Sequence, residues 1–162
     1  MAKTVFSIGL DLSYSGTGVV ILYGSNVAAY EFKAGKPKML TDERILNLWA
    51  QLEHVLPTDK PNCNIVIEGA AYAAEFNAFM LGELNVGLKV LLNMHGYKYK
   101  TVSPGTLKKY ATGSGTAQKT FVAACVAQKW NFVHASNNVT DAYVLAKIAE
   151  EGVESVGEKL NK

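Results

Sequence analysis

The chain has 162 residues, of which 49% are hydrophobic and 19% charged, and its formal net charge is +2 at pH 7. This length predicts one domain, and this composition excludes an intrinsically disordered protein. Apolar runs are too short to cross a bilayer, so we expect no membrane insertion. Residues 1–4 lead directly into a strand, so we expect no signal peptide. Cys63 and Cys125 stand far apart, which favours free thiols and a cytoplasmic location.

Charge is distributed unevenly along the chain. No Asp or Glu occurs between Glu83 and Asp141, and this span carries Lys89, Lys98, Lys100, Lys108, Lys109, Lys119 and Lys129. Such segregation predicts a polyanionic partner. The alternative is a solvated surface of scattered lysines.

The first apolar stretch contains a carboxylate at its centre. Residues 4–12 are rich in the apolar residue types that fit a mostly buried strand, and Asp11 lies within them. Burying a carboxylate is costly unless it is paired, hydrogen-bonded or bound to a metal. Asp11 is therefore either a turn-forming residue or part of a site whose partners come from elsewhere in the chain.

Short connections link the first strands, which predicts an antiparallel meander over residues 4–12, 17–23 and 27–33. An amphipathic helix capped by Thr41 is expected over 42–55, followed by a strand over 64–68 that ends at Glu68. A carboxylate at the end of a parallel strand lies where α/β sheets build their sites.

The next helix, over residues 75–94, is apolar on more than one side. This predicts either a dimer interface or a central helix that the chain itself covers. A fifth strand over 97–102, a short helix opened by Ser103 and Pro104, a helix over 117–129 and a last helix from Asn137 complete one domain, residues 1–152. Residues 153–162 are expected to be a frayed polar tail.

Carboxylates thus occur on the first strand (Asp11), at the end of the fourth (Glu68) and on the last helix (Asp141), where Asn138 shares the helix face of Asp141. The order β-β-β-α-β-α-β-α-α is typical of the RNase H-like fold, an α/β fold with a mixed five-stranded sheet. Converging oxygen ligands suit Mg²⁺, and two such ions about 4 Å apart can activate water for phosphodiester hydrolysis.

Within that fold the chain resembles the RuvC family of Holliday junction resolvases over nearly its whole length. The resemblance lies in residues 8–11 (IGLD), 65–68 (IVIE), 102–119, and 138–142, which end in Asp-Ala. It implies paired nicking of four-way DNA junctions, and of other branched DNA, by a homodimer that uses two Mg²⁺ or Mn²⁺ ions. The short and divergent sequence resembles a phage-encoded member, acting in the host cytoplasm.

Asn138 departs from the family pattern, which usually has an acid or His at this position. The resemblance implies metal ligands Asp11, Glu68, Asn138 and Asp141. An amide oxygen can bind a metal but brings no charge, so we expect weaker binding of the second ion or slower catalysis. His134 is nearby and could compensate, or it is simply exposed.

The resemblance also implies that Lys108 and Lys119 are important basic positions, with Lys109 beside them. Lysines contact phosphates without reading sequence, and Lys119 could in addition stabilise transition-state charge. The alternative is that they are surface lysines. For an aromatic residue that stacks on an unpaired base, Tyr72 is preferred over Phe76.

Two other functions remain open. One is a branched-DNA-binding protein with weak or absent cleavage, which a crippling effect of Asn138 would favour. The other is an actin-like or sugar-kinase ATPase, because residues 9–11 followed by small residues also resemble a phosphate loop. That fold needs two such lobes, which 162 residues cannot hold.

Overall fold

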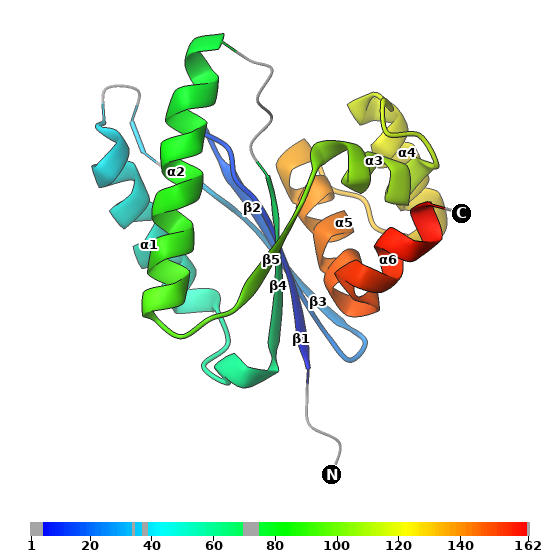
Figure 1. Cartoon of the computed structure of the whole chain (residues 1–162), viewed down its shortest axis with the longest axis horizontal. Coiled ribbons are helices and arrows are strands. Elements are labelled where there is room, and N and C mark those ends of the chain that lie inside the picture. Colours follow the sequence, from blue (N-terminus) through cyan, green and yellow to red (C-terminus); the bar gives the residue numbers. More distant parts are fainter. Residues whose placement is uncertain (1–4, 34, 37–38, 70–74, 162) are drawn as a thin grey trace.

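The computed structural model describes residues 5–33, 35–36, 39–69 and 75–161. One five-stranded sheet divides the molecule, with strand order β3-β2-β1-β4-β5. Helices cover both faces of this sheet (Figure 1). The expected RNase H-like architecture, three antiparallel strands followed by parallel ones, is confirmed.

The strands follow the apolar stretches of the sequence. They are β1 (Phe6–Asp11), β2 (Thr17–Tyr23), β3 (Asn26–Phe32), β4 (Cys63–Glu68) and β5 (Tyr99–Val102). Strands β1 and β4 are buried on both faces, which explains why their sequences run apolar with little alternation. Because β1 and β4 are parallel neighbours, their carboxyl ends, Asp11 and Glu68, lie side by side.

Two helical layers enclose the sheet. Helices α1 (Thr41–Val55) and α2 (Glu75–Met94) cover one face, and α5 (Asn137–Glu151) covers the other together with α3 (Pro104–Thr112), α4 (Lys119–Trp130) and α6 (Val153–Leu160) (Figure 1). A 3₁₀ turn (Lys60–Asn62) precedes β4. Among the described residues, none of these helices is both long enough and apolar enough to span a membrane.

Helix α5 lies directly on the sheet because two glycines leave room for it. A Cβ atom at Gly9 would stand 1.9 Å from the Ala142 carbonyl oxygen, and one at Gly18 would stand 2.0 Å from the Asn138 carbonyl oxygen. The small residues around Asp11 therefore admit a helix of the same chain. This close approach brings the first turns of α5 to the end of β1.

The structure differs from the sequence-based expectations at several boundaries. Residues 153–160, expected as a frayed polar tail, form helix α6, whose Val156 is only 1% exposed. The expectation was wrong because apolar residues at helical spacing are embedded in polar sequence. Helix α1 is capped by Leu40 rather than Thr41, and the Leu40 amide donates to the Glu43 carboxylate over 3.1 Å.

A buried arginine braces the loop that follows β1. The Arg44 guanidinium, 2% exposed, donates to the carbonyl oxygens of Tyr14 and Met39, each over 3.1 Å, and to that of Lys36. It also lies 4.0 Å from the centre of the Tyr14 ring. Its charge is satisfied by carbonyl dipoles, as a buried cation requires, and the loop beside Asp11 is thereby fixed.

Candidate active site

Three carboxylates converge on the α5 face of the sheet. Asp11 ends β1, Glu68 ends β4, and Asp141 lies one turn into α5. Each contributes an oxygen atom to a cluster in which these atoms all lie within 4.8 Å of one another. The structure thus brings together the three acids that the sequence analysis singled out.

Burial raises the pKa values of all three carboxylates, and neighbouring carboxylates raise those of Asp11 and Asp141 further. Burial raises the pKa of Asp11 well above its ordinary value, and the negative charges of Glu68 and Asp141 raise it further. Burial also raises the pKa of Glu68, and burial and the charge of Glu68 raise that of Asp141 to about 6. The Asp11 side chain, in turn, holds the pKa of Glu68 down.

This cluster fits hard divalent cations. Its donors are carboxylate oxygens, the ligands that Mg²⁺ and Mn²⁺ prefer, and no His or Cys of the described residues joins it. The pKa values of all three carboxyl groups are raised by burial even with Lys119 nearby. A bound divalent cation would compensate the negative charge that these buried carboxylates carry when ionised.

Asn138 lies one turn before Asp141 on α5. Its side-chain nitrogen donates to the Gly16 carbonyl oxygen over 2.9 Å and to a Glu31 carboxylate oxygen over 3.4 Å. Oδ1 is therefore the amide atom that remains for a cation. His134 is exposed, and its Nδ1 accepts a hydrogen bond from the Ser136 amide over 3.0 Å, on the Glu31 side of α5.

The lysines of the basic segment fall into two groups. Lys108 and Lys119 are close enough to the triad that both hold down the pKa values of Glu68 and Asp141. Lys109 instead donates to the Leu160 carbonyl oxygen, Lys129 donates to that of Ala111 over 2.6 Å, and Lys100 pairs with Glu154. Some of the lysines that the sequence concentrates in one span therefore make contacts within the protein.

Tyr72 lies outside the described residues, and so does the side chain of Phe76. Two further polar residues support the site and were missed from the sequence. Asn85 of α2, 4% exposed, donates to the Glu68 carbonyl oxygen over 3.2 Å, and Glu31 of β3 contacts Asn138. A polar residue at a buried position of an otherwise apolar helix was the available signal for Asn85.

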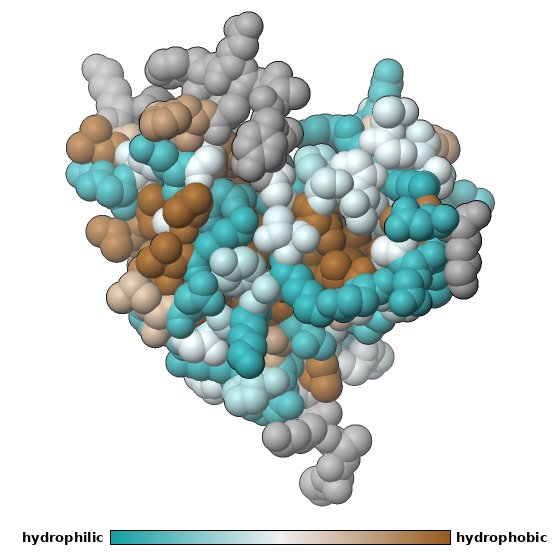
Figure 2. Space-filling model, in the orientation of Figure 1, coloured by the Kyte–Doolittle hydropathy of each residue, from teal (hydrophilic) through white to brown (hydrophobic). Residues whose placement is uncertain are grey.

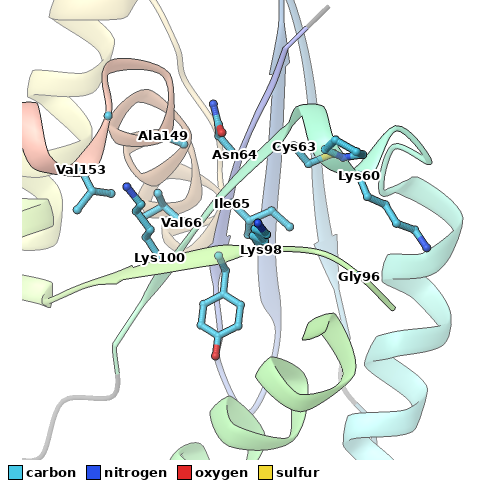
Figure 3. A pocket seen from close by; sticks show the side chains of 13 residues that line it. Lys60, Cys63, Asn64, Ile65, Val66, Gly96, Lys98, Lys100, Ala149 and Val153 are labelled. Carbon is cyan, nitrogen blue, oxygen red and sulfur yellow. The ribbon is translucent and has the colours of Figure 1, made fainter. Parts of the chain in front are cut away.

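A cavity lies elsewhere on the molecule. It measures about 770 Å³ and is lined by lysines and apolar residues of β4, β5, α5 and α6, among them Lys98, Lys100, Val66, Ala149 and Val153 (Figure 3). None of the triad residues is among those that line it. The triad and this cavity are therefore separate features of the molecule.

Comparison with solved structures finds the same fold. The chain is similar to the structure of Thermus thermophilus RuvC in complex with a Holliday junction substrate, with TM-score 0.70 and 19% identity over 94% of this chain and 96% of that one. A second Thermus thermophilus RuvC structure matches with TM-score 0.69 and 20% identity over 94% and 98%. No protein-family model matches, and neither does any curated protein sequence. At this identity the likeness concerns the fold.

Proposed function

We propose that the chain is a RuvC-like endonuclease that nicks four-way and other branched DNA with the help of Mg²⁺ or Mn²⁺. The observation that carries this proposal is the cluster of Asp11, Glu68 and Asp141 on a fold shared with a RuvC whose structure is in complex with a Holliday junction substrate. The expected phage origin and cytoplasmic location stay predictions.

The triad residues would hold the cations at the ends of β1 and β4. Bound there, a pair of divalent ions supplies activated water and charge stabilisation for phosphodiester hydrolysis. Carboxylates bind a cation in their ionised form, and the pKa of Asp11 is raised, so we expect metal binding to depend on pH. Lys119 and Lys108 lie beside the carboxylates, where an ammonium group can bind the phosphate and stabilise its developing charge.

Recognition of branched DNA would depend first on phosphate contacts. Lys108 and Lys119 are the lysines of the basic segment placed for this, and Lys109 is expected to contribute less because its ammonium contacts Leu160. Tyr72 remains our candidate for stacking on an unpaired base, on the basis of the family resemblance alone.

A homodimer is proposed from the surface of α2. Leu84, Leu88 and Leu92 of this helix are buried against the sheet. A second apolar stripe at helical spacing is exposed, formed by Phe79, Val86, Val90 and Met94. Hydrophobic surface is visible over α1 and α2 in Figure 2. An exposed apolar stripe marks an interface, and a two-fold dimer would present two triads to the two symmetric strands of a junction.

The test is cleavage of a synthetic four-way junction labelled in turn on each strand, with and without Mg²⁺. The wild-type protein should nick two opposing strands only with the metal. Asp11→Asn and Glu68→Gln should abolish nicking but keep junction affinity in EDTA, because phosphate contacts carry that affinity. Glu154→Gln, the same kind of charge change on α6, is the control. Nicking by Asp11→Asn at the wild-type rate would refute the triad as the metal site.

A second candidate is a branched-DNA-binding protein with little or no cleavage. The specific observation behind it is that Asn138, where the family usually has an acid or His, is neutral and hydrogen-bonded to Gly16 and Glu31. Selective junction binding without Mg²⁺- or Mn²⁺-dependent nicks would favour this reading. Restoration of nicking by Asn138→Asp would then show that the neutral side chain of Asn138 is the reason for weak or absent cleavage.

A further inference from the structure

A row of three residues crosses the sheet beneath the first turns of α5. Asp11 of β1 pairs with Gly18 of β2, and Gly18 pairs with Glu31 of β3. Paired residues of antiparallel strands point to the same face, so the two carboxylates flank a glycine. Because Gly18 has no side chain, the backbone of Asn138 occupies the space between Asp11 and Glu31.

Glu31 contacts the start of α5 through two side chains. One oxygen of its carboxylate accepts a hydrogen bond from the Ser136 hydroxyl over 2.7 Å and another from the Asn138 side-chain nitrogen over 3.4 Å. The same nitrogen donates to the Gly16 carbonyl oxygen over 2.9 Å. Gly16 leaves space for this arrangement, since a Cβ atom there would lie 3.3 Å from the Glu31 oxygen.

These partners select one of the two orientations of the Asn138 amide. An ionised carboxylate and a backbone carbonyl can only accept hydrogen bonds, so both require the amide nitrogen on their side. The opposite orientation would turn Oδ1 towards two acceptors, and it would offer a bound cation a hydrogen-bond donor. The orientation in the structure keeps Oδ1 as the atom available to a metal.

We propose that Glu31 is a positioning residue of the metal site, which fixes the Asn138 amide with its oxygen available as a ligand. This inference rests on the proposed function, because it assumes that the triad and Asn138 bind a divalent ion. Glu31 does this from the far side of α5, as a hydrogen-bond acceptor for the ligand residue. It therefore acts through Asn138 rather than by touching the metal or the DNA.

The test measures Mg²⁺ and Mn²⁺ binding without DNA, by calorimetry and by the metal-dependent rise of the unfolding temperature. In Glu31→Gln the new side chain can donate to Oδ1, so that only the Gly16 carbonyl still opposes the other amide orientation. Loss of a residue that orients a ligand typically costs 10- to 100-fold in metal affinity, and we expect about 10-fold here. Junction affinity in EDTA should not change. Glu154→Gln removes one charge at a site remote from the triad and should leave metal affinity unchanged.

A double mutant separates positioning from simple loss of charge or of stability. Asn138→Ala should itself weaken metal binding, and adding Glu31→Gln to it should have no further effect, because Glu31 then has no amide to orient. An equal loss in both backgrounds would overturn the proposal, since Glu31 would then act by its charge. Unchanged metal affinity in Glu31→Gln alone would overturn it as well. Failure of the proposed function looks different, because Asp11→Asn would then bind metal as tightly as the wild type.

Discussion

At the scale of the residue, Asp11 is the most constrained group in the molecule. It is 7% exposed and two of its neighbours are carboxylates, so burial and like charge both raise its pKa. Such an arrangement costs folding free energy unless a cation compensates it. At this position, the carboxylate that allows metal binding therefore lowers the stability of the metal-free protein.

The raised pKa values of Asp11 and Asp141 predict how the stability of the metal-free protein depends on pH. The pKa of Asp141 is about 6 in the folded protein, and that of Asp11 is also raised, whereas an unfolded aspartate titrates near 3.9. Protons therefore bind the folded state more tightly, and their contribution to stability is full below pH 4 and is lost as pH rises through about 6. In EDTA, the contribution of these two aspartates to the unfolding temperature should decrease between pH 4.5 and 7.5.

The variant Asp11→Asn should remove the share of that contribution that comes from Asp11 and leave the share that comes from Asp141. At pH 7.5 in EDTA we expect it to be more stable than the wild type by about 1–3 kcal/mol, because a buried charge is replaced by a neutral group of the same shape. Saturating Mg²⁺ should reverse the order, since only the wild type gains binding energy. Identical pH profiles for the two proteins would contradict the pKa assignment.

At the scale of the element, α5 owes its position to glycine. Gly9→Ala would place a Cβ atom against backbone atoms of Ala142 and Ala146, which cannot move without displacing the helix that carries Asp141. We expect a loss of about 3 kcal/mol or more in the free energy of unfolding, measured by urea denaturation, together with weaker metal binding.

The matched control is Gly157→Ala on α6, where no neighbouring atom lies within 4 Å of the added Cβ. It should be neutral or should stabilise the protein by about 0.5–1 kcal/mol, because alanine is the better helix former. If both variants lost the same stability, the close seating of α5 on β1 would be disproved.

Helix α2 supports a second prediction at this scale. Val86 and Val90 are exposed on its outer stripe, so Val86→Asp with Val90→Asp would place charges in the proposed interface without touching the core. Light scattering should give about twice the chain mass for the wild type and the mass of one chain for the variant. The hairpin variant Val27→Asp, at another exposed valine, should keep the wild-type mass. A monomeric wild type, with and without DNA, would argue against paired nicking.

Elements whose apolar residues repeat at strand or helix spacing could be predicted from the sequence, as for β1 and α2. Asp11, Glu68 and Asp141 could be predicted because each interrupts or ends such an element. Helix α6 could not, because its few apolar residues are diluted by charged ones. Glu31 was missed for another reason, since its partner Ser136 lies far along the chain and no local pattern joins them.

At the scale of the whole molecule, positive charge is divided between recognition and structure. Lys108 and Lys119 lie beside the triad, whereas Lys109, Lys129 and Lys100 contact α6, α3 or a carboxylate. A net charge of +2 therefore conceals a local concentration of cations next to three acids. The excess of lysine was visible in the sequence, but the contacts that occupy some of these side chains were not.

The salt dependence of junction binding should reveal this division. Each phosphate contact removed reduces the slope of log affinity against log salt by about one, so Lys108→Gln and Lys119→Gln should each show this change in metal-free buffer. Lys109→Gln is the matched control and should change the slope less. Equal changes for all three lysines, measured by fluorescence anisotropy, would contradict the proposed distribution.

The packing of α5 on the sheet also determines when, during synthesis of the chain, the three acids can come together. Asp11 and Glu68 belong to the early strands, but Asp141 and the helix that covers Gly9 and Gly18 are made late. A nascent chain that ends before α5 leaves the α5 face of β1 and β2 uncovered and holds two of the three acids. Contacts so distant in sequence are formed slowly. Asp141 is the last of the three acids along the chain, so the complete triad can form only after α5 has been synthesised.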